Sequence, residues 1–185
     1  SLVGSEMCIR DSLYIFSGID NKCSINEIKQ IREYVAKGGK IFISNSPETA
    51  QQIYPEYISG NMKPTEGDIA NMEIPESPVF DDIDLLELRY FNNNKREIPT
   101  ICNTVLKVNR NANIEELANQ TKIHGYINGD MTQRSEYVKT IKGYPLLKIH
   151  DNKGVATIST MSLEKAVTDP VAGKLLTNII YDLLK

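Results

Sequence analysis

The chain has 185 residues, of which 41% are hydrophobic and 24% are charged, and these values are ordinary for a globular domain with its own core. A formal net charge of −3 gives no electrostatic reason to expect nucleic acid or an anionic membrane surface as a partner. No apolar run approaches the ~20 residues that span a bilayer, and the cysteines include no CxxC pair that would indicate a disulfide framework.

The first segment, residues 1–12 (SLVGSEMCIRDS), shows neither a helical nor a strand period. It resembles the translation of a transposase sequencing adapter, which reads LVGSEMCIRD. We therefore expect residues 1–12 to be a non-native tail and exclude them from fold reasoning. Residues 13–185 are then expected to form one α/β domain that is incomplete at its start.

A strand–helix–strand unit follows. Residues 13–16 (LYIF) indicate the end of a buried strand. Ser24 lies three positions before Glu27, the spacing of a capping box, and isoleucines recur behind it at helical intervals. Gly38 and Gly39 end this helix, and residues 40–44 (KIFIS) follow as a second strand. A βαβ unit of this kind predicts two parallel strands.

The middle of the chain is less regular. Ser46, which precedes a proline and a glutamate, predicts the N-cap of a short helix. Residues 57–78 are rich in Pro, Gly, Asn and acidic residues, and we interpret them as a long excursion without strands. A new segment starts at Ser77, and residues 92–94 (NNN) predict a loop.

The last third indicates strands and a closing helix. Residues 104–108 predict a strand, whereas residues 114–127 are ambiguous between strand and helix. Residues 146–149 and 155–158 flank the turn sequence DNKG and predict a hairpin. Asp169 and the proline after it begin a helix with a broad apolar face. The predicted fold is a three-layer α/β domain, with a mostly parallel sheet flanked by helices and a C-terminal hairpin and helix.

The candidate nucleophiles do not form a recognisable catalytic pattern. The turn at residues 44–47 (SNSP) lacks the glycines of a G-x-S-x-G elbow, so Ser46 is interpreted as a helix cap rather than a nucleophile. Cys23 precedes the first helix but has no histidine partner visible in the sequence, and is interpreted as a solvent-facing or half-buried thiol. Cys102 lies in an apolar run and is assigned to the core.

The other titratable residues do not indicate a metal or cofactor site. His124 and His150 are not spaced as a metal pair; a surface role is expected for His150 and a binding role is considered for His124. An acidic run is interpreted as the charged first turn of a helix rather than as a glycosidase pair: Asp81, Asp82, Asp84 and Glu87. No G-x-G-x-x-G or P-loop motif occurs, and no cofactor is predicted.

The most ligand-like cluster is residues 89–92 (RYFN), because aromatic and planar polar groups together suit a sugar or a protein surface. The alternative is that the two aromatic residues are core and Arg89 extends to solvent. The candidate binding residues are therefore Arg89, Tyr90, Asn92 and His124. No catalytic residue and no metal ligand is predicted.

Three stretches carry a resemblance to known families. Residues 28–45 (IKQIREYVAKGGKIFISN) resemble the helix, Gly-Gly, strand segment of class I glutamine amidotransferase-like domains. Residues 77–94 (SPVFDDIDLLELRYFNNN) resemble a segment near the C-terminus of bacterial family-two glycoside hydrolases, the β-galactosidase type. Residues 154–184 resemble the closing segment of the same enzymes. The three stretches follow one another in the order found in those proteins, and the resemblance extends over essentially residues 13–185.

The resemblance implies a non-catalytic accessory domain. In such hydrolases the catalytic carboxylates lie on an upstream TIM barrel, and nothing in this chain matches them or the elbow cysteine and His-x-Glu motif of active amidotransferases. The implied partners are upstream catalytic domains of the same parent chain, a second copy, or a carbohydrate, with no nucleic acid and no membrane. A periplasmic or secreted parent is implied, and the isolated chain is expected to be poorly soluble or partner-dependent.

Two other hypotheses come from different classes. One is a stand-alone small-molecule or sugar-binding module with a flavodoxin-like sheet. Its ligand would lie beyond the carboxyl ends of the strands, near Ser17 and Gly18 and near Ser44 and Asn45. The other is a hydrolase in its own right that uses Cys23 or Ser46.

Overall fold

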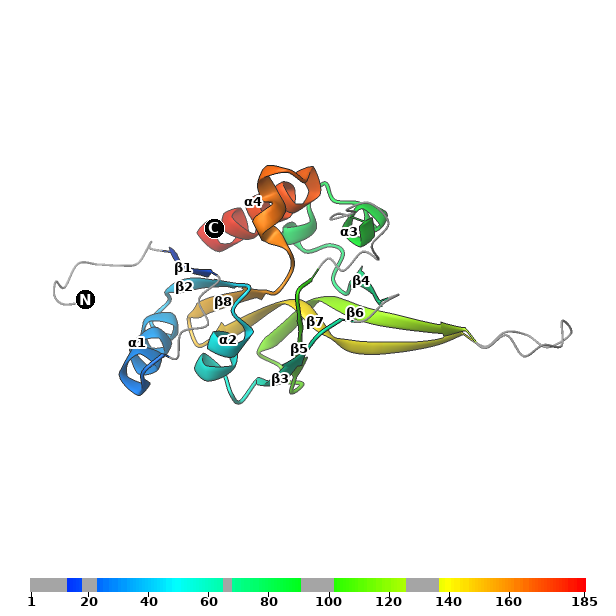
Figure 1. Cartoon of the computed structure of the whole chain (residues 1–185). Coiled ribbons are helices and arrows are strands. Elements are labelled where there is room, and N and C mark those ends of the chain that lie inside the picture. Colours follow the sequence, from blue (N-terminus) through cyan, green and yellow to red (C-terminus); the bar gives the residue numbers. More distant parts are fainter. Residues whose placement is uncertain (1–12, 18–22, 65–67, 91–101, 126–136) are drawn as a thin grey trace, which may run out of the picture.

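The computed structural model describes residues 13–17, 23–64, 68–90, 102–125 and 137–185. An eight-stranded mixed sheet runs through the molecule in the order β1-β2-β8-β7-β5-β3, with β6 paired to β7 and β4 paired to β6 (Figure 1). The strands are β1 (Leu13–Ser17), β2 (Lys40–Ser44), β3 (Ile58–Met62), β4 (Asp68–Met72), β5 (Val105–Val108), β6 (Ile114–Gly125), β7 (Tyr137–Asp151) and β8 (Gly154–Ser159).

The strand–helix–strand unit is confirmed. Helix α1 (Ile25–Ala36) begins with a complete capping box, in which Ser24 and Glu27 each satisfy the other's backbone N–H. The helix ends before Gly38, whose φ of 107° is a backbone conformation that favours glycine. Strands β1 and β2 pair in parallel, as predicted, and β2 pairs in parallel with β8.

Strand β1 is not the buried strand that its apolar sequence predicts. Among the described strands it pairs only with β2, and the Ile15 side chain is 56% exposed. Its side chains alternate between two cores, because Leu13 packs on one face of the sheet and Tyr14 and Phe16 pack on the other. The run is apolar throughout because both faces of the strand contact core residues, and this pattern also fits an edge position.

The predicted excursion at residues 57–78 is wrong in part, because it contains strands β3 and β4. Strand β3 pairs antiparallel with β5, and β4 pairs antiparallel with β6. Their sequences, ISGNM and DIANM, hold glycine and asparagine residues that are poor strand formers. Pairing with a partner distant in sequence overrides this weak local preference.

The later strands agree with the prediction. The β7–β8 hairpin is confirmed, with Asn152 at φ 55° in its turn. The ambiguous segment from residue 114 is a strand, β6, which pairs with β7 in a long hairpin that projects from the rest of the molecule (Figure 1). Parallel pairing joins β1, β2 and β8, and the remaining described pairs are antiparallel.

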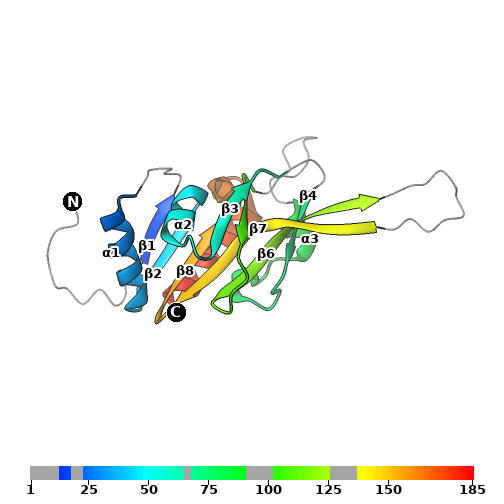
Figure 2. The ribbon, with the colours of Figure 1, turned by 90° about the horizontal axis from the view of Figure 1, so that it is seen from below.

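Helices cover both faces of the sheet, which confirms the three-layer α/β fold. Helices α1 and α2 (Pro47–Ile53) lie on one face, while α4 (Pro170–Leu184) and the 3-10 turn η1 (Pro78–Phe80) lie on the other (Figures 1 and 2). Each face has its own core, one around Phe42, Leu146 and Leu175 and one around Ile41, Leu147 and Ile158. Asp169 caps α4 by accepting hydrogen bonds from Val171 and Ala172.

Two smaller segments complete the α4 face. Helix α3 (Leu85–Tyr90) places Leu88 in this core, and the 3-10 segment η2 (Leu163–Val167) connects β8 to α4. At the start of α3, Asp84 accepts from the backbone of Leu86 and Glu87 accepts from the backbone of Asp84. Asp84 and Glu87 therefore place negative charge at the start of α3, as predicted for the acidic run. No helix in the described part of the chain is long and apolar enough to cross a membrane.

Candidate functional site: the carboxyl edge of the parallel strands

The three parallel strands end at one edge of the sheet, and each ends in a serine. Ser17 of β1 is in register with Ser44 of β2, and Ser44 is in register with Ser159 of β8. Ligands of open α/β sheets bind beyond the carboxyl ends of the strands, where the chain leaves the sheet for a helix. This edge is therefore the expected place for a ligand in this fold.

The turn that follows β2 leads from the strand into helix α2 through one residue with positive φ. Asn45 adopts φ 51° between the strand and helix α2, a left-handed conformation that is uncommon for a residue with a side chain and best tolerated by asparagine and aspartate. Its backbone N–H donates to the Ser159 carbonyl at 2.8 Å, which links the turn to β8. A sharp strand-to-helix turn of this kind holds one side chain up at the edge of the sheet.

The predicted capping role of Ser46 is corrected. Ser46 occupies the N-cap position of α2, but its side chain makes no capping hydrogen bond. Its hydroxyl instead donates to the Ser44 carbonyl at 3.2 Å, and the residue is 1% exposed. The helix start is set by the proline at its first position, whose φ is already helical.

A pocket of about 280 Å³ opens beside Asn45, on the α4 face of the sheet. Its apolar wall comes from the sheet, η2 and α4, and its polar rim comes from the strand ends and η2. The lining residues are Ile15, Ser17, Phe42, Ser44, Asn45, Leu163, Glu164, Leu176 and Ile180. The volume is close to the lower end of the ~300–1,000 Å³ that is typical of small-molecule sites.

One hydrogen bond organises the polar rim. The Asn45 amide nitrogen donates to the Glu164 carboxylate at 2.8 Å, across 119 positions of sequence. The amide oxygen of Asn45 is buried and has no hydrogen-bond partner among the described residues. The described lining residues include no lysine or arginine, and the charge among them comes from Glu164. The rim suits a ligand that donates hydrogen bonds and does not suit an anion.

The described lining of the pocket shows no recognised pair of nucleophile and histidine base. An amide such as that of Asn45 is not a nucleophile, and no histidine or cysteine is among the lining residues. His150 lies at the opposite edge of the sheet, opposite Val155 near the start of β8, where its ring is 2.5 Å from a Glu115 carboxylate oxygen. The arrangement can bind a small molecule, and Glu164, the carboxylate among its described lining residues, is hydrogen-bonded to Asn45.

The described residues among those predicted from sequence are not part of the lining of this pocket. Arg89 is half-buried on α3 and donates to the Asn71 side chain at 2.6 Å, so it joins α3 to β4 rather than extending freely to solvent. The backbone of His124 pairs with Val138 toward the outer end of the β6–β7 hairpin. Tyr90 is the last residue of α3, and Asn92, like the loop at residues 92–94, lies outside the described residues. The structure does not bring Arg89 and His124 together.

The burial of the two cysteines in the described ranges agrees with the prediction. Cys102 is 1% exposed and donates to the Gln120 side chain at 3.1 Å. Cys23 is half-buried beside α1, where burial and the Glu27 carboxylate raise the pKa of its thiol. This environment is the opposite of the one that activates a thiol nucleophile.

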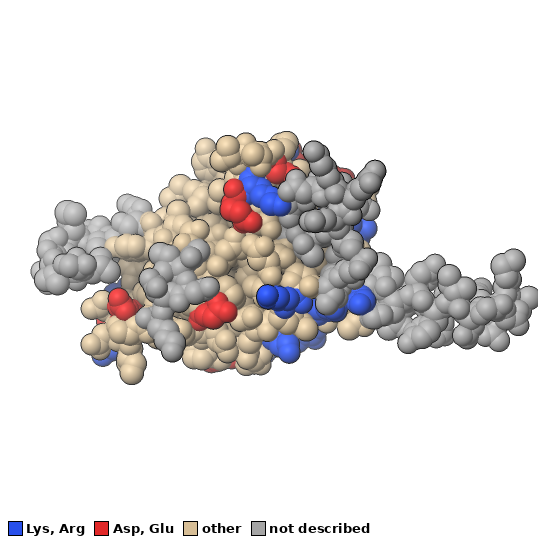
Figure 3. Space-filling view, viewed as in Figure 1, with Lys and Arg blue, Asp and Glu red and all other residues tan. Residues whose placement is uncertain are grey.

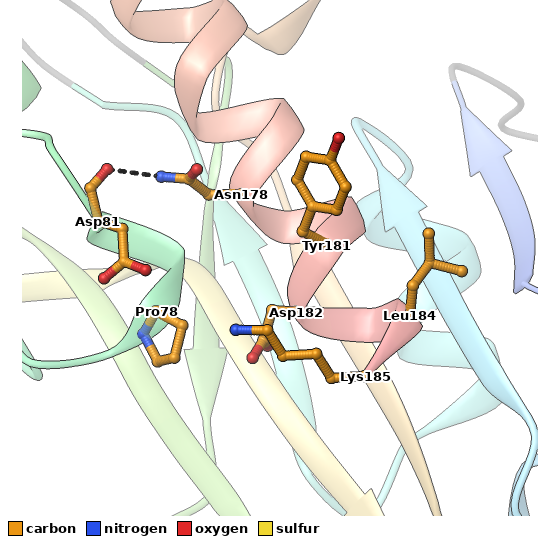
Figure 4. A pocket seen from close by; sticks show the side chains of 7 residues that line it. All are labelled: Pro78, Asp81, Asn178, Tyr181, Asp182, Leu184 and Lys185. Atoms are coloured by element: carbon orange, nitrogen blue, oxygen red, sulfur yellow. Dashed lines mark hydrogen bonds between the residues drawn. The ribbon is translucent and has the colours of Figure 1, made fainter.

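A second hollow lies between η1 and the end of α4 (Figure 4). Its polar groups already serve packing, because the Asn178 amide donates to the backbone of Val79 and Asp81, and Asp182 forms an ion pair with Lys148 at 2.6 Å. Charges of both signs are scattered over the face shown in Figure 3. No cluster of three or more potential metal ligands occurs in the part of the chain that the structure describes.

Comparison with known proteins supports the fold and does not show a family. No family model and no curated protein matches the chain. Among solved structures it resembles "Cytoplasmic Protein STM3548 from Salmonella typhimurium", with a TM-score of 0.53 and 13% identity over 92% of this chain and 71% of that chain. It also resembles "Cytoplasmic Protein STM1381 from Salmonella typhimurium LT2", with a TM-score of 0.51 and 14% identity over 85% of this chain and 60% of that chain.

A more distant likeness is to a β-galactosidase from Rahnella sp. R3, with a TM-score of 0.47 and 10% identity. It covers 92% of this chain and 22% of that enzyme. At these identities the similarity shows the α/β fold alone.

Asn45 and Glu164 were missed by sequence reasoning as members of one site. The sequence pattern of a nucleophile elbow is a serine or cysteine between flanking glycines. An asparagine without flanking glycines does not match this pattern. One usable signal is present: a single asparagine between a strand and a Ser-Pro helix start indicates a residue that tolerates positive φ. Glu164 has no sequence signal of this kind, because it lies 119 positions from Asn45 and contacts it only in the folded chain.

Proposed function

We propose that this chain is a non-catalytic accessory domain from the C-terminal part of a β-galactosidase-type glycoside hydrolase. One observation carries the proposal: in the strand-to-helix turn after β2 the residue with positive φ is Asn45, whereas a nucleophile elbow needs a serine or cysteine in such a turn. The domain would support the catalytic barrel, form an oligomer interface or contact substrate.

The resemblance of three sequence stretches supports this proposal. The stretch at residues 28–45 contains most of helix α1, Gly38, Gly39 and β2, which fold as an α/β unit. The stretch at residues 154–184 contains β8, η2 and α4 and begins with the glycine of the β7–β8 turn. Both stretches meet at the carboxyl edge, because Asn45 belongs to the first and Glu164 to the second.

Turnover assays on the full chain test the non-catalytic part of the proposal. We expect no hydrolysis of a nitrophenyl galactoside or a nitrophenyl ester, and no release of ammonia from glutamine, above the rate in buffer. Cys23→Ala and Ser46→Ala variants are assayed in parallel. Turnover that disappears in one of these two variants would overturn the proposal and identify the nucleophile.

A second candidate function is a sugar-binding module, and the pocket beside Asn45 favours it. The rim offers the Glu164 carboxylate and serine hydroxyls to the hydroxyl groups of a small neutral sugar, while the apolar wall faces its C–H groups. The absence of lysine and arginine from the lining disfavours sugar phosphates and sugar acids.

Calorimetric titration of the chain with galactose tests this second candidate. We expect binding that weakens at least about tenfold in Asn45→Gly, which removes the amide while glycine accepts the positive φ. Asn152→Gly is the matched control, because Asn152 has φ 55° in the β7–β8 turn and does not line the pocket. Equal affinity in both variants would exclude the Asn45 pocket as the sugar site.

A further inference from the structure

A separate pocket of about 350 Å³ lies on the other face of β1, between this strand and helix α1. Strand β1 supplies Tyr14 and Phe16, and α1 supplies Glu27 and Tyr34. The remaining lining residues are Cys23, Gln30, Ile31 and Ile41. Three of its eight lining residues are therefore aromatic, whereas aromatic residues make up only 7% of the whole chain.

The aromatic rings are held in a defined arrangement. The Tyr14 and Tyr34 ring centroids are 4.9 Å apart and their planes meet at 89°, so the two rings form two walls at a right angle. Tyr34 also packs onto the backbone of Gly39, since a Cβ at that position would lie 2.3 Å from the tyrosine ring. The rings are thus fixed by the fold before any ligand arrives, and pre-fixed groups bind with less loss of entropy.

The charge of the pocket is negative. Hydrogen bonds from Ser24 to one carboxylate oxygen of Glu27 lower the pKa of this residue, so it is ionised at neutral pH. The capping box uses Oε2 and leaves Oε1 outside its hydrogen bonds. Among the residues that the structure describes, no lysine or arginine lines the pocket, and the raised pKa of the Cys23 thiol disfavours its charged form.

We propose that this aromatic pocket binds a small organic cation of the quaternary ammonium class. A quaternary ammonium group has no N–H to satisfy, so aromatic faces and one nearby carboxylate suit it better than a hydrogen-bonding rim does. The proposal goes beyond the accessory role, because the pocket lies on the α1 face, opposite the Asn45 pocket, and shares no lining residue with it.

Choline and its uncharged isostere 3,3-dimethylbutan-1-ol test the proposal directly. The two molecules have the same shape and differ in the nitrogen that carries the charge. In NMR titrations of the full chain we expect choline to bind about tenfold more tightly than the alcohol and to shift signals of Tyr14, Phe16 and Tyr34. Equal affinities, binding of neither compound, or shifts confined to other residues would overturn it.

Two variants separate the carboxylate from the rings. Glu27→Gln removes the charge but keeps the capping box, which accepts either residue at this position. Glu33→Gln on the exposed side of the same helix is its control. Phe16→Leu removes a ring from the partly buried edge strand and keeps an apolar side chain, and Tyr181→Leu, an exposed aromatic on α4, is its control.

We expect Glu27→Gln and Phe16→Leu each to weaken choline binding about fivefold and to leave binding of the alcohol nearly unchanged. The two control variants should match the original chain. If Glu27→Gln binds choline as tightly as the original chain does, the cation site is not this pocket. This result would leave the accessory-domain proposal standing, because the turnover assays test that proposal separately.

Discussion

Three non-glycine residues of the described chain have positive φ, and all three are asparagine or aspartate: Asn45, Asp82 and Asn152. Asn152 could be predicted, because it lies in a DNKG turn between two alternating apolar runs. Asn45 could not be placed in the same way, since its neighbours form a strand and a helix cap rather than a recognised turn. The positive φ of Asn45, which shapes the candidate site, could therefore be established only from the structure, although asparagine is a residue type that tolerates it.

Gly154 brings the β7–β8 turn into close contact with the end of helix α1, and this contact predicts that a larger residue is destabilising. A Cβ at Gly154 would lie 2.0 Å from the Val35 carbonyl oxygen and 2.3 Å from that of Gly39, and both are backbone atoms that cannot move aside cheaply. We expect Gly154→Ala to lower the free energy of unfolding by about 2–3 kcal/mol in urea titrations.

Gly60→Ala is the matched control for this substitution. Nothing lies within 4 Å of a Cβ built at Gly60, which is in strand β3. Its free energy of unfolding should change by less than about 1 kcal/mol. Equal destabilisation by the two substitutions would show that the β7–β8 turn does not pack against α1 as described.

The environment of Cys23 predicts a pH dependence. The raised pKa means that less thiolate is present near neutral pH than in an unfolded chain, and alkylation proceeds through the thiolate. We expect iodoacetamide to modify Cys23 in the folded chain more slowly than in the urea-unfolded chain, with a rate that keeps rising with pH past the point where the rate in the unfolded chain levels off. Peptide mass spectrometry measures this rate. Faster reaction in the folded chain near pH 7 would contradict the assigned environment.

At the scale of elements, helices with local start signals could be predicted and edge strands could not. The capping box of α1 and the Asp-Pro start of α4 are short sequence patterns whose physical effect is local. Strands β3 and β4 carry polar residues and a glycine, and they are strands because β5 and β6 offer them pairing partners 43 or more positions away. Local propensity does not encode such pairing.

An ion pair fastens helix α4 to the sheet. Lys148 on β7 and Asp182 on α4 lie 2.6 Å apart with side chains only 11% and 14% exposed. Asp182→Ala leaves a largely buried ammonium group, so we expect it to lower the free energy of unfolding by more than about 2 kcal/mol. Chemical denaturation monitored by circular dichroism measures the change.

The double variant Lys148→Met, Asp182→Leu should recover most of this loss, because two apolar side chains replace the pair without leaving a buried charge. The exposed pair Lys29–Glu33 is the control, and Glu33→Ala should cost less than about 1 kcal/mol. A double variant no more stable than Asp182→Ala alone would mean that the packing of α4, and not the charge, was disturbed.

At the scale of the whole molecule, the edge strand β1 presents an exposed apolar side chain. Ile15 is 56% exposed on a strand that pairs only with β2 among the described strands, and such edges promote association. We expect Ile15→Lys to raise the monomer fraction in size-exclusion chromatography with light scattering. Ile25→Lys is the control, since Ile25 is 85% exposed but lies on α1. Equal effects of both variants would assign the association to general hydrophobicity.

The α/β class and the three-layer arrangement could be predicted from periodicity and caps, because those signals act within one element. The candidate site could be predicted only as a place, the carboxyl ends of the strands near Ser44 and Asn45. Its composition could not, because Glu164, Leu176 and Ile180 arrive from the far end of the chain. The composition of residues 89–92 predicted a binding cluster. In the structure the Arg89 side chain donates a hydrogen bond to Asn71 and so joins α3 to β4.

The accessory-domain proposal is tested most directly by reading the source DNA upstream of the codons for residues 1–12. The account predicts that, beyond the adapter-like codons, the reading frame continues into a sugar-binding sandwich and a barrel with paired glutamates. A start codon just before a complete first strand would contradict it. The chain would then be a small independent domain, and the sugar-binding module would become the leading function.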